Sequence, residues 1–210
     1  MKKFAFTTIF SVLLLVACSK KEDKPQQSAE VKTDVQDTLI SIEKLKKQAG
    51  TYSETDPAIH LNILETFAVA KSLYPDMPEQ HLATEHMFQM TTLSNGKITP
   101  FHKFEDWESI KAFYGESDQN LRHITIEVYD KTSYKKSKQK AFDTCKNIWK
   151  NIDERVPNEI NELADRLRVY EQENSSAMTN HIRYGYMFLL DASHYQDGYP
   201  VVCTIGYDKT

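Results

Sequence analysis

The chain has 210 residues, with 26 basic and 30 acidic side chains and a formal net charge of −4. This length is enough for one or two domains with a buried core. The mild acidity argues against nucleic-acid binding, which needs a basic surface.

The first residues have the layout of an export signal. Lys2 and Lys3 precede a mostly apolar run from Phe4 to Leu15, as in secretory signal peptides. A helix that spans the ~30 Å hydrocarbon core of a membrane needs about 20 apolar residues, and this run is shorter. We therefore expect residues 1–17 to be a cleaved signal peptide rather than a permanent anchor.

The apolar run ends in Leu15-Val16-Ala17-Cys18. This tetrapeptide resembles the lipobox of bacterial lipoprotein precursors, and the resemblance covers residues 1–18. It implies that the Cys18 thiol receives diacylglycerol, that the chain is cut before Cys18, and that a fatty acid such as palmitate caps the new amino end. Two or more acyl chains anchor a protein stably, whereas one binds marginally. The alternative is an ordinary signal peptide followed by a chance cysteine.

The resemblance also implies an address in the cell envelope. In many Gram-negative lipoproteins, Asp after the lipidated cysteine retains the protein at the inner membrane, and this chain has Ser19 there. We therefore expect the outer membrane, facing the periplasm, if the host is Gram-negative. Residues 18–36 are polar and charged apart from a few small apolar side chains. This composition predicts a flexible tether after Cys18, the residue that the resemblance implies is lipidated.

Residues 37–210 are expected to form a single globular α+β domain, whose first part, residues 37–115, is expected to be a helical subregion. An apolar stripe predicts a helix over about 37–49 that Gly50 ends, and Pro57 is expected to open a second helix that Pro75 closes.

Two further helices are expected in this subregion. Apolar residues at intervals of three and four predict helices over about 77–91 and 104–114. Residues 87–93 have an alternative as a strand, because Asn95-Gly96 is typical of a hairpin turn that would pair this segment with 97–101.

The second part, residues 121–210, predicts the order strand, helix, helix, strand, strand. Alternating apolar residues predict strands over 124–129, 182–190 and 201–207, and apolar stripes predict two helices between the first two strands. The last two strands are expected to pair in antiparallel fashion. The predicted fold class is α+β, with helices packed on one face of a small, mainly antiparallel sheet.

Two cysteines remain besides Cys18. Cys145 and Cys203 fall on the apolar faces of a predicted helix and a predicted strand. An even pair in an exported protein indicates a disulfide. Across 58 residues of separation, such a bond would stabilise the fold by about 4 kcal/mol in the chain-entropy model. The alternative is two separate buried thiols.

No pattern in the sequence predicts a catalytic residue, a metal site or a cofactor. The chain has no G-x-S-x-G, no phosphate-binding glycine loop and no C-x-x-C. His81, Glu85 and His86 are the tightest histidine cluster, but they lack the spacing of zinc proteases.

The candidate binding residues lie in the turn between the last two strands. They are His194, Tyr195, Asp197 and Tyr199. Tyrosine is enriched at interfaces because it joins a large contact area to a polar tip. The alternative is a turn whose tyrosines fold back on the core.

These features predict a membrane-anchored envelope lipoprotein without enzymatic activity. It would act as a protein-binding, assembly, or immunity or inhibitor module. Its expected partners are the membrane, through the N-terminal lipid, and another envelope protein. The alternatives are an envelope hydrolase acting on cell wall or lipid, and a carrier of a small ligand or lipid.

Overall fold

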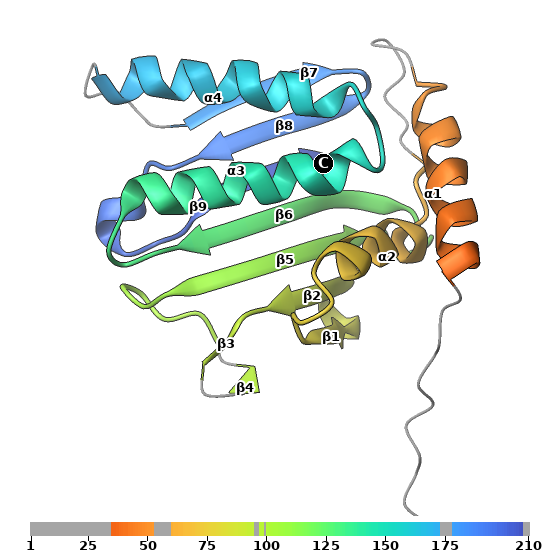
Figure 1. Ribbon diagram of the computed structural model, residues 1–210, viewed down its shortest axis with the longest axis horizontal. Coiled ribbons are helices and arrows are strands. Elements are labelled where there is room, and N and C mark those ends of the chain that lie inside the picture. Colours follow the sequence, from red (N-terminus) through yellow and green to blue (C-terminus); the bar gives the residue numbers. More distant parts are fainter. Residues whose placement is uncertain (1–34, 53–59, 95–96, 99, 173–177, 208–210) are drawn as a thin grey trace, which may run out of the picture. The chain divides into compact units, whose positions relative to one another are not determined.

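A seven-stranded sheet, antiparallel at every pairing, forms the centre of the fold in a computed structural model (Figure 1). The structure describes residues 35–52, 60–94, 97–98, 100–172 and 178–207. In spatial order the strands are β1 (Glu79–Leu82), β2 (Met87–Thr91), β5 (Trp107–Tyr114), β6 (Leu121–Tyr129), β9 (Val201–Gly206), β8 (Tyr186–Asp191) and β7 (Met178–Arg183). A separate short pair joins β3 (Leu93–Ser94) to β4 (Lys97–Ile98).

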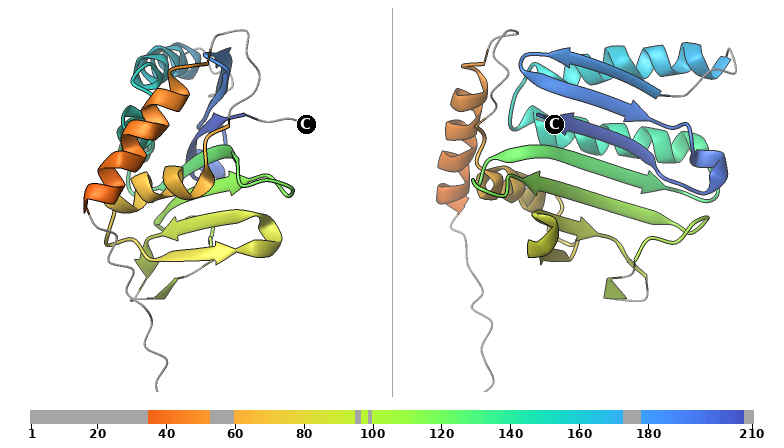
Figure 2. Two further views of the ribbon diagram at one scale, coloured as in Figure 1. Left: turned by 90° about the vertical axis from the view of Figure 1, so that its right-hand side faces the viewer. Right: turned by 180° about the vertical axis from the view of Figure 1, so that it is seen from behind.

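Helices pack on one face of this sheet, as Figure 2 shows in two further views. α2 (Ile63–Leu73) contacts β5, α3 (Tyr134–Lys150) contacts β6 and β9, and α4 (Val156–Gln172) contacts β7 and β8. α1 (Val35–Ala49) packs against α2. The predicted α+β fold class is confirmed, with a sheet larger than the three strands foreseen.

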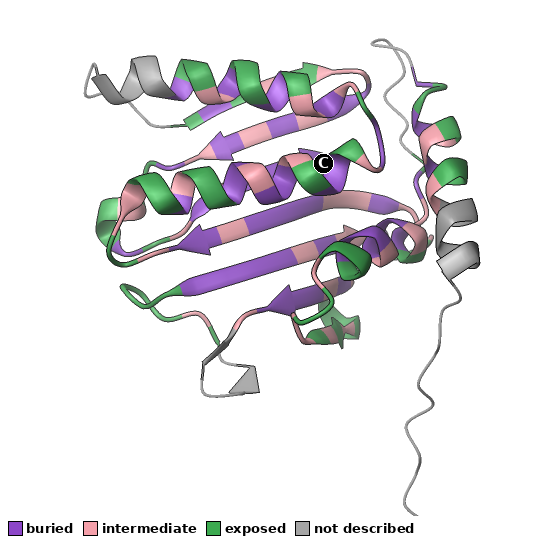
Figure 3. Cartoon of the chain, viewed as in Figure 1, coloured by how far each residue is buried: buried purple, intermediate pink, exposed green. Residues whose placement is uncertain are grey.

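Alternation along the strands places the core between sheet and helices. Ile110, Ile126, Cys203 and Leu190 are matched across β5, β6, β9 and β8 and all are fully buried (Figure 3). Trp149 of α3 packs edge-on against Tyr186 of β8, with ring centroids 5.0 Å apart. Burial of such side chains is the main force that holds helices to the sheet.

Polar side chains set the starts of two helices. The Asn62 side chain accepts hydrogen bonds from the Leu64 and Glu65 amides and caps α2, and the Ser133 hydroxyl caps α3. Such caps satisfy amides that have no partner inside the helix. The expected helix start at Pro57 is wrong for α2; Pro57 itself lies outside the described residues.

A disulfide joins α3 to β9. The sulfurs of Cys145 and Cys203 are bonded, and their Cα atoms lie 6.4 Å apart, within the Cα separation that a disulfide spans. Both residues are fully buried. The bond links the helix layer to the sheet.

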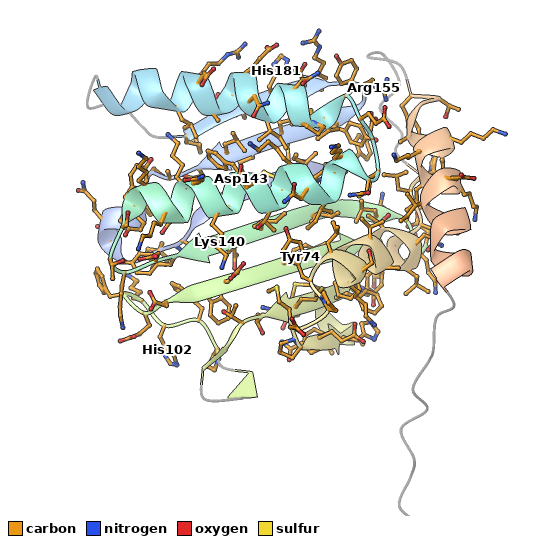
Figure 4. The ribbon with its side chains drawn as sticks, in the orientation of Figure 1. Tyr74, His102, Lys140, Asp143, Arg155 and His181 are labelled. Atoms are coloured by element: carbon orange, nitrogen blue, oxygen red, sulfur yellow. A yellow bond between two sulfur atoms is a disulfide. The ribbon has the colours of Figure 1, made fainter. Side chains whose placement is uncertain are left out.

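Arg155 ties the α3–α4 connection to the end of α1 (Figure 4). Its guanidinium donates to both carboxylate oxygens of buried Asp153 and to the carbonyl oxygens of Ala49 and Tyr52. The hydrogen bond to Asp153 is the largest cause that raises the pKa of Arg155. A fixed positive charge therefore closes the C-terminal end of α1, where helix carbonyls lack partners.

The first part of the domain corrects several predictions. Residues 37–115 are not a helical subregion, because β1, β2 and β5 lie in it. The helix expected over 77–91 is wrong, while the alternative strand at 87–93 agrees with β2. The helix expected over 104–114 is wrong too, because β5 is buried on both faces and so lacks the alternation that identifies a strand.

The strand expected over 182–190 is two strands. β7 and β8 are joined at Tyr184-Gly185, and both residues have positive φ, 54° and 76°. Two such residues fit the type I′ turn that closes tight hairpins. The last three strands are therefore β7, β8 and β9, and β8 and β9 pair in antiparallel fashion as expected. Among the described residues, no helix is long and apolar enough to cross a membrane.

Candidate functional site

One face of the sheet carries no helix in the described part of the chain (Figure 2, right); we call it the open face. Strand register assigns to it the odd-numbered residues of β2, β5 and β8, those of β6 from His123 onward, and the even-numbered residues of β7 and β9. Its centre is polar, and the Thr125 and Thr204 hydroxyls hydrogen-bond at 2.9 Å. Toward β7 it becomes apolar, with half-buried Met187 and Leu189.

A hollow of about 460 Å³ opens on this face, and we call it the open-face pocket. It gathers residues from four separate parts of the chain: Phe101, Lys111, Glu127, Asp191, His194, Tyr199, Pro200 and Val202. The volume falls in the range of small-ligand pockets, about 300–1,000 Å³.

An ion pair lies among the lining residues of the pocket. The Lys111 ammonium lies 2.8 Å from one oxygen of Glu127 and 2.9 Å from the other. The indole N–H of Trp107 donates to the same carboxylate at 3.2 Å. Both charged side chains are about four-fifths buried, so the charges are held in place with partners rather than presented to solvent.

Aromatic residues build one wall of the pocket. The rings of Phe101 and Tyr199 stack with centroids 5.8 Å apart, and the Lys103 ammonium lies 4.2 Å from the centroid of the Tyr199 ring. The Phe104 amide donates to the Gly198 carbonyl, and a Cβ on Gly198 would lie 2.8 Å from the Phe104 ring. This close approach, together with a φ of 85°, requires glycine at position 198.

The structure divides the four candidate binding residues. His194 and Tyr199 line the pocket. Asp197 lies beside it, with one carboxylate oxygen 3.3 Å from His194 Nδ1. Tyr195 turns inward instead, where it contacts Tyr129 and Tyr134 and donates to the Asp130 carbonyl.

Tyr195 thus follows the alternative in which a turn tyrosine folds back on the core. Burial is the largest cause that raises the pKa of its hydroxyl. Tyr195 therefore anchors the turn, and His194 and Tyr199 are the two candidate residues that line the pocket.

A second hollow, of about 720 Å³, runs between α3 and α4. It is larger than the open-face pocket, but it is a furrow between neighbouring helices. Two of its charged lining residues already pair with each other, because the Lys146 ammonium lies 2.8 Å from an Asp143 carboxylate oxygen. Elsewhere on α3, Lys140 pairs with the buried carboxylate of Glu108 (Figure 4 labels Lys140 and Asp143). We therefore take the open-face pocket as the candidate site.

Sequence reasoning missed six pocket residues, which are Phe101, Lys111, Glu127, Asp191, Pro200 and Val202. The first three are far from the others in the chain, and only the strand order brings them together. Across the described residues, no group of three His, Cys, Asp or Glu side chains is arranged to hold a metal ion. Comparisons with protein families, with characterised proteins and with solved structures found no match.

Proposed function

We propose that this chain is a bacterial envelope lipoprotein, anchored through Cys18, that binds another envelope protein through the open face of its sheet. The observation that carries the proposal is the open-face pocket. It joins stacked aromatic side chains to a fixed ion pair on the open face of the sheet. Aromatic anchors beside desolvated polar groups are typical of the centres of protein interfaces.

The polar groups of the pocket support binding rather than catalysis. Glu127 is engaged by Lys111 and Trp107. One oxygen of Asp191 accepts from the Ser193 amide and hydroxyl, and His194 lies against Asp197. A general acid or base needs a group free to exchange a proton with its substrate, whereas these groups hold one another in position.

A pull-down tests the binding role. Tagged full-length chain would be recovered from detergent-solubilised envelopes, as wild type and as Tyr199→Ala. Leu73→Ala is a matched control, since Leu73 and Tyr199 are each 39 % exposed and Leu73 lies on α2, on the helix-covered side. We expect one protein to copurify stoichiometrically with wild type and control and to fall at least tenfold with Tyr199→Ala, about 1.4 kcal/mol.

Other outcomes would assign a different function. If the same amount of partner protein copurified with all three chains, the pocket would not be part of the interface. The pocket volume favours a second candidate, a carrier of a small ligand. A bound small molecule that wild type retains and Tyr199→Ala loses, with no copurifying protein, would support that carrier.

The lipid anchor has its own test. Cells fed labelled palmitate should label the wild-type chain and leave Cys18→Ala unlabelled, and the variant should retain residues 1–17. Normal cleavage of Cys18→Ala, with release to the soluble fraction, would show an ordinary signal peptide instead.

A further inference from the structure

We propose that β7 is a self-association edge, through which two copies of this chain pair strand to strand in antiparallel fashion about Asn180. β7 is the last strand of the sheet and pairs, among the described residues, with β8 alone. An edge strand of this kind presents backbone groups that another strand can bind. The partner we infer is a second copy of the same chain.

The two edges of the sheet differ. β1 has four residues, and its Glu79 forms an ion pair with Lys71 at 2.8 Å. β7 has six residues and carries Met178 and Ile182, which are 44 % and 74 % exposed. Short strands and charges protect an edge from pairing, whereas a longer edge with exposed apolar side chains invites it.

The exposed side chains of β7 are self-complementary. Met178 and Ile182 lie two residues on either side of Asn180, so all three side chains fall on the open face. In an antiparallel pairing centred on Asn180, each Ile182 lies opposite the Met178 of the other copy. Facing Cβ atoms in such a ladder are about 4.5–5.5 Å apart. Both apolar pairs would extend the apolar part of the open face at Met187 and Leu189.

The backbone hydrogen-bonding groups of β7 that point away from β8 belong to the residues that the proposed pairing needs. A two-residue turn with positive φ at both positions closes on the pair Arg183 and Tyr186, and such a closing pair exchanges both hydrogen bonds. Because bonded and non-bonded positions alternate, Arg183, His181 and Thr179 bond inward to β8. The amides and carbonyls of Met178, Asn180 and Ile182 then point outward, and these are the residues that would meet their counterparts.

Charge does not oppose this pairing. The Arg183 guanidinium lies 2.6 Å from Glu159, and His181 Nε2 lies 4.0 Å from the same buried carboxylate. Both basic side chains lie on the helix-covered face, away from the apolar pairs (Figure 4 labels His181). In the proposed register His181 meets Thr179 of the other copy, so like charges do not lie directly opposite each other.

Cysteine cross-linking of the full-length chain in detergent tests the register. Asn180 would face its counterpart at a Cα separation of about 5.5 Å, within the range of a disulfide. Under mild oxidation we expect a covalent dimer from Asn180→Cys. Thr179→Cys is the matched control, because its side chain lies on the other face and would meet residue 181. Adding Ile182→Lys to Asn180→Cys should lower dimer yield at least tenfold.

The outcomes separate this inference from the proposed function. Asn180→Cys with Tyr199→Ala should still form the dimer, because Tyr199 lies in the loop before β9 and not on β7, even though another pocket residue, Asp191, pairs with Met178 at the end of β7. Light scattering should give a dimeric mass for wild type and a monomeric one for Ile182→Lys, with unchanged circular dichroism. A monomeric wild type, equal cross-linking of both cysteine variants, or a cross-link from Asn180→Cys to a different protein would overturn it.

Discussion

At the scale of single residues, Tyr186 is an ionisable phenol in an apolar core. Its side chain is fully buried beside Trp149. Burial first, and then the negative charge of Asp153, raise the pKa of Tyr186 far above its usual range. The hydroxyl therefore stays protonated in the folded state at pH values where an unfolded tyrosine would ionise.

This shift makes stability depend on alkaline pH. A group whose folded-state pKa is raised contributes stability that is complete below the unfolded pKa, about 10 for tyrosine, and lost as pH rises beyond it. Tyr186→Phe cannot ionise. We expect its free energy of unfolding, relative to wild type, to be constant between pH 7 and 9. Above pH 10 it should rise by up to about 1.4 kcal/mol per pH unit.

Urea unfolding at several pH values measures this difference. Comparing the variant with wild type at each pH cancels the titration of the other tyrosines and the lysines. A difference that stays flat to pH 11 would show that Tyr186 ionises without penalty in the folded protein.

At the scale of elements, the local sequence pattern was enough to predict some helices but not every strand. The α3 and α4 helices were predictable because each has one buried stripe and one solvent face. β5 was not, since Trp107 and Ser109 are buried on the open face while Ile110 and Ala112 are buried on the other. A strand buried on both faces leaves no alternation to read.

The β7–β8 hairpin shows how an alternating pattern can mislead. Ile182, Tyr186 and Phe188 are all even-numbered, and an unbroken strand would put them on one face. The turn at Tyr184-Gly185 reverses this relation, because register pairs Arg183 with Tyr186. Ile182 is therefore exposed while Tyr186 and Phe188 are buried. Gly185 was the local signal for this turn, and the exposed edge of β7 follows from it.

The start of α2 carries an element-scale prediction. Asn62 accepts from the amides of Leu64 and Glu65 at 2.9 and 3.2 Å, so Asn62→Ala should lower the free energy of unfolding by about 1 kcal/mol. Asn62→Asp keeps the accepting oxygen and should lose much less. Thermal unfolding should show a drop of about 2–4 °C for the Ala variant. Equal losses for both variants would mean that the side chain serves packing rather than capping.

At the scale of the whole molecule, the order of elements makes long-range contacts essential. β9 is the last strand in the chain, yet it lies between β6 and β8 near the centre of the sheet. The polypeptide must therefore bring residues 121–129 and 201–206 together before the sheet is complete. The open-face pocket depends on the same step, because Glu127 and Val202 line it from those two strands.

The Cys145–Cys203 bond acts at this scale, because it ties α3 to the strand that closes the sheet. With the cysteines 58 positions apart in the sequence, the bond restricts the unfolded chain and should stabilise the fold by about 4 kcal/mol in the chain-entropy model. The double variant Cys145→Ala, Cys203→Ala should therefore lose about 2–5 kcal/mol in urea unfolding.

The burial of the disulfide leads to a second prediction, about how fast a reductant reaches it. Both cysteines are fully buried, so reductant reaches the sulfurs only when the domain opens. Reduction of the native protein should therefore be slow and should accelerate with urea in step with unfolding. Fast reduction in native buffer would show that α3 separates from β9 without global unfolding. The helix layer would then be a unit that opens separately from the sheet.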